Sequence, residues 1–159
     1  MTHRRGAAAR RRWPVLRGGH RGSAVVEFLG VSVLLLVPLV YLILTLARVQ
    51  AATFAAEGAA REAGRIIAQA ADMTEASARA GRAVEVAFAD QGFDVDGETA
   101  LRVTCVEGPC LSPGAQVLVE VGVDVDLPLV PDFVSVAVPA HVPVAAAHLA
   151  VVSEYREAP

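Results

Sequence analysis

The sequence predicts an α+β protein: an N-terminal transmembrane helix extended into a long amphipathic helix, followed by a small antiparallel β-sheet ectodomain. Three observations support this fold class. Residues 28–47 form a run of twenty residues without a charge, small residues then recur at helical spacing, and apolar residues alternate with polar ones beyond residue 100. The composition agrees, because a chain that is 54% hydrophobic is more apolar than an ordinary soluble domain.

The first segment, residues 1–22, is a basic arm that fixes the orientation of the chain. It holds seven of the fourteen arginines and no acidic residue, whereas residues 23–159 carry all seventeen acidic residues. Positive charges beside a spanning helix stay in the cytoplasm, so we expect a cytoplasmic N-terminus and an extracytoplasmic C-terminal region. The arm contains one aromatic residue, Trp13. It therefore fits the surface of an anionic membrane, and we expect no nucleic-acid partner.

The second segment, residues 23–47, is the predicted transmembrane helix. Twenty residues at about 1.5 Å each cover roughly 30 Å, the thickness of the hydrocarbon core. A secretory signal cut near Ala51 is an alternative, but its apolar region would be about 7 to 15 residues long. Glu27 at the cytoplasmic edge also needs a reason, because a carboxylate at the centre of a spanning helix costs about 2.5 to 3.5 kcal/mol.

The residues around Glu27 suggest that reason. Gly22 is followed five residues later by Glu27 and then by Phe28, between the basic arm and the apolar run. This arrangement resembles the prepilin processing site of type IV pili, in particular that of TadE-like minor pilins of Tad/Flp (tight-adherence) pili. The resemblance extends over about residues 21–70 and includes the Ala/Arg-rich stretch 59–65. Phe28 favours the TadE-like branch, because major Flp pilins are shorter and usually have Tyr there.

The resemblance implies a prepilin peptidase as a partner, which cuts after Gly22 and leaves Ser23 as the new N-terminus. Residues 1–22 would then be the prepilin leader, and Glu27 would occupy the fifth mature position. Its carboxylate could pair with the new amine of a neighbouring pilin or pseudopilin subunit in low dielectric. A snorkelling acid without a partner is the alternative. The protein would lie in the lipid membrane and, after processing, in a surface pilus that serves adhesion or secretion.

The third segment, residues 48–90, is predicted to be helical. The first helix continues to about residue 71 and carries Pro38 inside the span, where a kink or local unwinding is expected. Its small residues recur every fourth position and suit packing either against another subunit or against the protein's own sheet; they are Ala52, Ala56, Ala60 and Gly64. A second helix begins at Asp72 or Thr74, runs to about Asp90 and stops at Gly92. Glu57 with Arg61, and Glu75 with Arg79, have the spacing of helical ion pairs.

The fourth segment, residues 91–159, is predicted to be rich in β-structure. Strict alternation over residues 117–127 indicates a half-buried antiparallel strand, with a shorter strand at 101–106 and one or two more over 133–138 and 142–152. Pro139 and Pro143 mark a break, a bulge or an edge. We expect the long helix to pack on this small antiparallel sheet, an arrangement that resembles the pilin fold by analogy with the family named above. Residues 94–98 are expected to form a solvated acidic turn.

Cys105 and Cys110 flank a Gly-Pro turn, and their spacing predicts a disulfide in an extracytoplasmic hairpin. They are too few for a zinc site. His141 and His148 lie seven apart on a strand and hence on opposite faces. No catalytic motif occurs, so we expect no enzyme activity, cofactor, metal or small-molecule substrate. The prediction is a minor pilin that acts by assembly, and the alternative is a single-pass membrane-anchored extracytoplasmic binding module that is not processed as a pilin.

Overall fold

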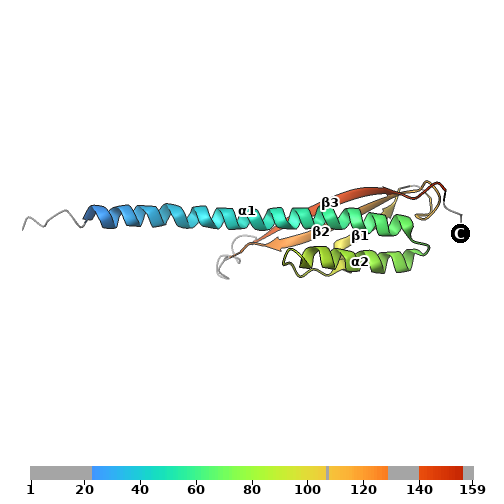
Figure 1. Ribbon diagram of the computed structural model, residues 1–159, viewed down its shortest axis with the longest axis horizontal. Coiled ribbons are helices and arrows are strands. Elements are labelled where there is room, and N and C mark those ends of the chain that lie inside the picture. The colour runs from blue at the N-terminus through green and yellow to red at the C-terminus, as the bar shows by residue number, and fades with distance from the viewer. Residues whose placement is uncertain (1–22, 107, 129–139, 156–159) are drawn as a thin grey trace, which may run out of the picture. The chain divides into compact units, whose positions relative to one another are not determined.

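The computed structural model describes residues 23–106, 108–128 and 140–155, and within them it shows the predicted α+β arrangement (Figure 1). A long apolar helix near the N-terminus is followed by a second helix and a three-stranded antiparallel sheet. The elements are α1 (Ser23–Gln69), α2 (Met73–Ala89), α3 (Gly97–Ala100), β1 (Leu101–Cys105), β2 (Gln116–Asp126) and β3 (His141–Val151). The predicted basic arm and the predicted strand at 133–138, with Pro139, lie outside the described residues. The chain divides into two compact units, Met1–Leu39 and Val40–Pro159.

The first unit, as far as it is described, is the apolar beginning of α1. This helix runs through Pro38 without interruption, so the local unwinding expected as one outcome does not occur. Its apolar side chains are exposed, with Phe28 at 69% and Leu34 at 72%. By length and composition α1 could cross a membrane.

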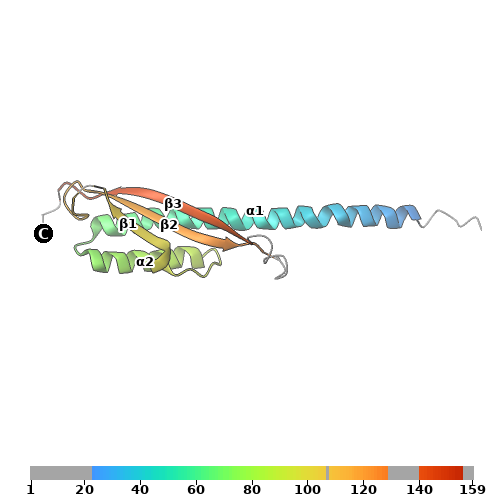
Figure 2. The same cartoon turned by 180° about the vertical axis from the view of Figure 1, so that it is seen from behind.

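The second unit is built around one hydrophobic core between helices and sheet. α1 from Val40 onward and α2 lie on the same face of the sheet, and α2 runs back alongside α1 (Figures 1 and 2). Four valines on alternate positions of β2 are fully buried or nearly so, which confirms the predicted half-buried strand; they are Val117, Val119, Val121 and Val125. The opposite face of β2 is largely exposed, with Glu120 and Asp124 on it.

The small residues of α1 pack against the protein's own fold. Ala52, Ala56 and Ala60 are buried in the same core as the β2 valines. A Cβ built on Gly64 would lie only 2.9 Å from His148 Cδ2 and 3.2 Å from Ala150 Cβ, so a larger residue here would require these β3 side chains to shift. Of the two alternatives for these small residues, packing on another subunit or on the protein's own sheet, the structure supports packing on the sheet.

Both ends of α2 are determined by short sequence motifs. Asp72 caps the N-terminus, and its carboxylate accepts a hydrogen bond of 2.8 Å from the Glu75 N–H. At the other end Gly92 adopts φ +75°, its N–H bonds to the Ala89 carbonyl, and the Phe93 N–H bonds to the Phe88 carbonyl. These two bonds define a Schellman motif, in which an apolar contact between the residues at the positions of Phe88 and Phe93 is typical. The predicted cap and stop are both confirmed.

Within the described residues the sheet has the order β1-β2-β3, which places β3 at one edge. Val119 of β2 pairs with Val103 of β1 and with His148 of β3. Hydrogen bonds join Leu127 N–H to the Ala140 carbonyl and Val152 N–H to the Ala115 carbonyl. In this register the even-numbered residues of β3 direct their backbone N–H and carbonyl groups toward β2, and the odd-numbered residues direct theirs away from it. Pro143 is one of the odd-numbered residues, so its missing N–H removes no hydrogen bond to β2. This confirms the prediction that Pro143 marks a sheet edge.

The segment at 94–98 differs from the solvated turn that the sequence suggested. Asp94 and Asp96 are exposed as expected, but Gly97 opens the one-turn helix α3 and is buried. The Asp96 carboxylate accepts a hydrogen bond of 2.9 Å from the Glu98 N–H. Gly97 is buried because its backbone lies close to α2, where a Cβ on Gly97 would lie 2.0 Å from the Gly81 carbonyl oxygen.

Candidate functional site

The first part of the candidate site is the beginning of α1. Gly22 lies outside the described residues, and Ser23 is the first residue of the helix. Glu27 and Phe28 follow about one turn later, and both are exposed. Among the described residues no hydrogen bond or ion pair reaches the Glu27 carboxylate. Glu27 is also the only charged residue between Ser23 and Arg48.

The electrostatic consequence depends on where this helix end lies. In water an exposed carboxylate needs no partner, but in hydrocarbon an unpaired charge is expensive. The twenty residues that follow Glu27 are uncharged, and the side chains beside it are apolar and exposed, such as Val26 at 71% and Phe28 at 69%. If this surface lies in lipid, the structure offers Glu27 no partner within the described part of its own chain.

The second part of the site is the junction at the other end of the uncharged run. Arg48 is the first charge after the run, and its guanidinium carbon lies 4.4 Å from the centre of the Phe93 ring. The Phe93 ring meets the Phe88 ring edge to face, with centroids 6.1 Å apart. Phe88 is fully buried in the core. A chain of side-chain contacts therefore connects Arg48 through Phe93 to Phe88 in the core.

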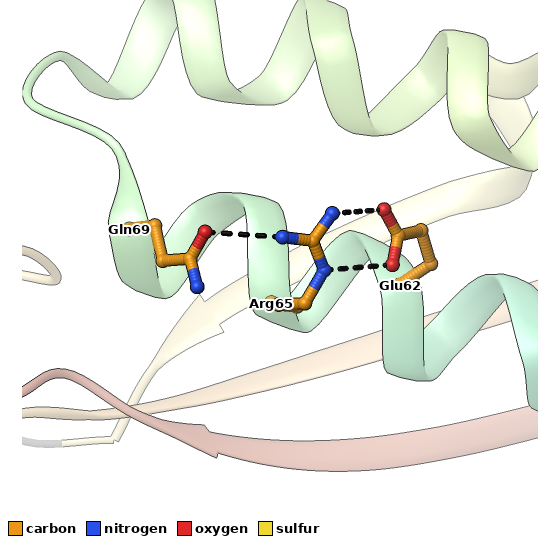
Figure 3. A network of polar contacts seen from close by, with 3 residues as sticks. All are labelled: Glu62, Arg65 and Gln69. Carbon is orange, nitrogen blue, oxygen red and sulfur yellow. Dashed lines mark hydrogen bonds and ion pairs between the residues drawn. The ribbon is translucent and has the colours of Figure 1, made fainter.

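Farther along α1 the exposed surface is polar and internally paired (Figure 3). Arg65 donates to both carboxylate oxygens of Glu62 and, at 3.1 Å, to the Gln69 side-chain oxygen. The hydrogen bond from Arg65 lowers the pKa of Glu62 below its usual value, and Glu62 raises the pKa of Arg65 in return. Arg61 pairs with Glu57 at 3.6 Å, as the spacing predicted. Exposed pairs of this kind contribute little stability and do not form a binding site by themselves.

The two cysteines form the predicted disulfide, with their Cα atoms 4.9 Å apart. Cys105 is the last residue of β1, but Cys110 lies in the loop and not at the start of β2, which begins at Gln116. The bond therefore closes a small loop that contains Gly108 at φ +62°. It fixes one part of the β1–β2 connection and does not join two strands across a simple hairpin.

The remaining polar residues do not converge. His141 and His148 lie on opposite faces of β3, as predicted. Glu75 and Arg79 form the predicted pair on α2, at 3.9 Å. Among the described residues no three His, Cys, Asp or Glu side chains lie close enough together to hold a metal ion.

Comparison of the chain with protein-family models, curated proteins and solved structures finds no match. The site is therefore defined by its own geometry. It consists of an exposed apolar helix with one acid near its beginning and an arginine, held on an aromatic stack, where the uncharged run ends.

Sequence reasoning did not find the contact between Arg48 and Phe93. The local signal was present, because Gly92 followed by Phe93 after a helix predicts where the Phe93 side chain folds back onto α2. What the sequence did not give is the packing of α2 beside α1, which brings Phe93 to Arg48. Such long-range placement depends on the shared core and not on a motif.

Proposed function

We propose that this protein is a prepilin-like minor pilin of the TadE type, which takes part in assembly of a Tad/Flp-type type IV pilus. A prepilin peptidase would remove residues 1–22 by cleavage after Gly22. The mature chain would remain in the cell membrane through α1, with its C-terminal region outside the cytoplasm. Its partners would be the peptidase, other pilin and pseudopilin subunits and the lipid membrane.

The observation that carries the proposal is Glu27, a single acid near the start of an apolar, exposed helix and without a partner among the described residues. Cleavage after Gly22 would create an α-amine at Ser23. In a group of such helices the carboxylate of one subunit can then pair with the amine of a neighbour, which removes the penalty for a lone buried charge. The function follows from assembly and requires no catalytic group.

A pair of substitutions separates processing from assembly. Gly22→Val should block cleavage and leave a full-length precursor that keeps the basic arm, because the peptidase must accommodate the residue at the cut. Glu27→Gln should be cleaved and inserted normally but should join other pilins poorly, since the charge is lost while size and hydrogen-bonding ability are nearly kept.

Glu57→Gln is the matched control for Glu27→Gln. It removes an acid from the same helix, but Glu57 is exposed and paired with Arg61 within its own chain. The measurements are the ratio of precursor to mature protein in membranes, co-purification with other pilins, and surface pili. If Glu27→Gln assembles as well as Glu57→Gln, charge pairing is refuted. An unprocessed wild-type chain in cells that contain the peptidase would favour an anchored binding module instead.

A further inference from the structure

The junction between the uncharged run and the folded part of the chain contains an arginine with unused hydrogen-bonding capacity. Arg48 is exposed, and none of the three ion pairs among the described residues includes it. The guanidinium carbon lies over the Phe93 ring at 4.4 Å from its centre, and this contact with the ring replaces no ion pair of the N–H groups. Arg48 is therefore oriented by the ring but not neutralised.

The position of Arg48 along α1 suggests the missing partner. Ala47 ends the twenty-residue run, which covers roughly 30 Å of helix and so matches the hydrocarbon core. The next residue, Arg48, then lies just outside the hydrocarbon core, where a long side chain can reach the lipid phosphates. Arginines beside a spanning helix are more common on the cytoplasmic side, so an arginine on the outer side departs from the usual charge distribution.

We propose that Arg48, held by Phe93, binds the phosphate of a lipid headgroup on the outer side of the membrane and so fixes the folded part of the chain at the bilayer surface. A guanidinium binds a phosphate through two parallel N–H···O bonds, which a stacked, preoriented side chain forms at a lower entropic cost. The inference rests on the membrane anchoring in the proposed function, but not on processing or pilus assembly.

The position of Arg48 at the end of the uncharged run favours a lipid over an acidic protein partner. Asp90 and Asp94 flank the segment that carries Phe93, and both are exposed. These two acids disfavour a large anionic protein surface at this place, whereas Arg48 directly follows the twenty-residue uncharged run of α1, which favours an anion presented at the membrane surface. Zwitterionic lipid suffices, since each headgroup carries a phosphate.

The test measures the depth of residue 93 in vesicles that contain the full chain. Phe93→Trp keeps an aromatic face under Arg48, and Trp13→Phe makes the introduced indole the only one in the chain. The chain is inserted into phosphatidylcholine vesicles with a nitroxide either at the headgroup or halfway along the acyl chain. We expect the headgroup nitroxide to quench the fluorescence of the introduced tryptophan at least twofold more strongly than the acyl nitroxide, and Arg48→Gln to abolish this difference.

Arg82→Gln is the matched control, because Arg82 is also exposed and in no ion pair among the described residues, but lies on α2. It should leave the quenching unchanged, as should addition of inorganic phosphate, since the proposed ligand is a lipid. Equal quenching by the two nitroxides, or an unaltered pattern in Arg48→Gln, would overturn the lipid contact. Flotation with the vesicles reports anchoring separately: a chain that does not float fails both proposals, and one that floats without headgroup quenching fails this one alone.

Discussion

Replacing Gly97 by alanine should destabilise the folded unit strongly, although only one methyl group is added. The new Cβ would lie 2.0 Å from the Gly81 carbonyl oxygen and 2.6 Å from its carbonyl carbon. Ordinary contacts begin at 3.4 Å, so the two backbones would have to separate by about 1.4 Å. Both obstructing atoms are backbone atoms of α2 and cannot rotate away. Overpacking of this kind costs about 3 kcal/mol.

Gly81, the other residue of this contact, gives a matched control in which alanine should raise the stability and not lower it. Gly81 lies inside α2, and a Cβ built on it meets nothing closer than the Gly97 carbonyl carbon at 3.5 Å. Gly81→Ala therefore adds a methyl group to an ordinary contact and removes a glycine from a helix interior, which should stabilise by up to about 1 kcal/mol. The two variants add the same group to the same pair of backbones.

The assay is urea unfolding of the full chain in detergent, followed by circular dichroism, with the midpoint and slope compared between variants. The expected difference between Gly97→Ala and Gly81→Ala is about 3 to 4 kcal/mol. Equal stabilities of the two variants, or a more stable Gly97→Ala, would refute the close backbone contact between α2 and α3.

Two further predictions concern the surface of the folded unit. Cys105 and Cys110 should resist alkylation in the native exported protein and react after reduction; two freely alkylated thiols would contradict the disulfide. Glu62 should titrate below an ordinary glutamate in an NMR pH series, and Arg65→Gln should bring its pKa back toward the usual value. Because the folded pKa is lowered, the small stabilisation from this pair is present above the unfolded pKa and is lost as the pH falls through the folded pKa. An unchanged titration in Arg65→Gln would show that Arg65 is not the cause.

Features that depend on local sequence could be predicted well. The alternation of valines in β2, the Asp72 cap, the stop at Gly92 and the ion pair of Glu57 with Arg61 each involve residues within a few positions of one another. The chemistry of these short segments is enough to specify them. The apolar run could be predicted equally well, because its length and its lack of charged residues can be read directly from the sequence.

Features that depend on packing between distant segments could not be predicted. The sequence left the purpose of the small residues in α1 open, and it is the burial of Ala52, Ala56 and Ala60 in the core and the closeness of Gly64 to His148 that show packing on the protein's own sheet. It did not predict the burial of Gly97 at the start of α3, because that burial comes from contact with Gly81, sixteen residues earlier. It predicted that Cys105 and Cys110 flank the turn of a hairpin, whereas the β1–β2 connection is longer than a simple turn.

The most direct test of the proposed function is the N-terminus of the protein isolated from membranes of cells that contain a prepilin peptidase. N-terminal sequencing and intact mass should show a chain that starts at Ser23 and has lost residues 1–22 with their seven arginines. A chain that starts at Met1 or at Ala52 would contradict processing as a prepilin.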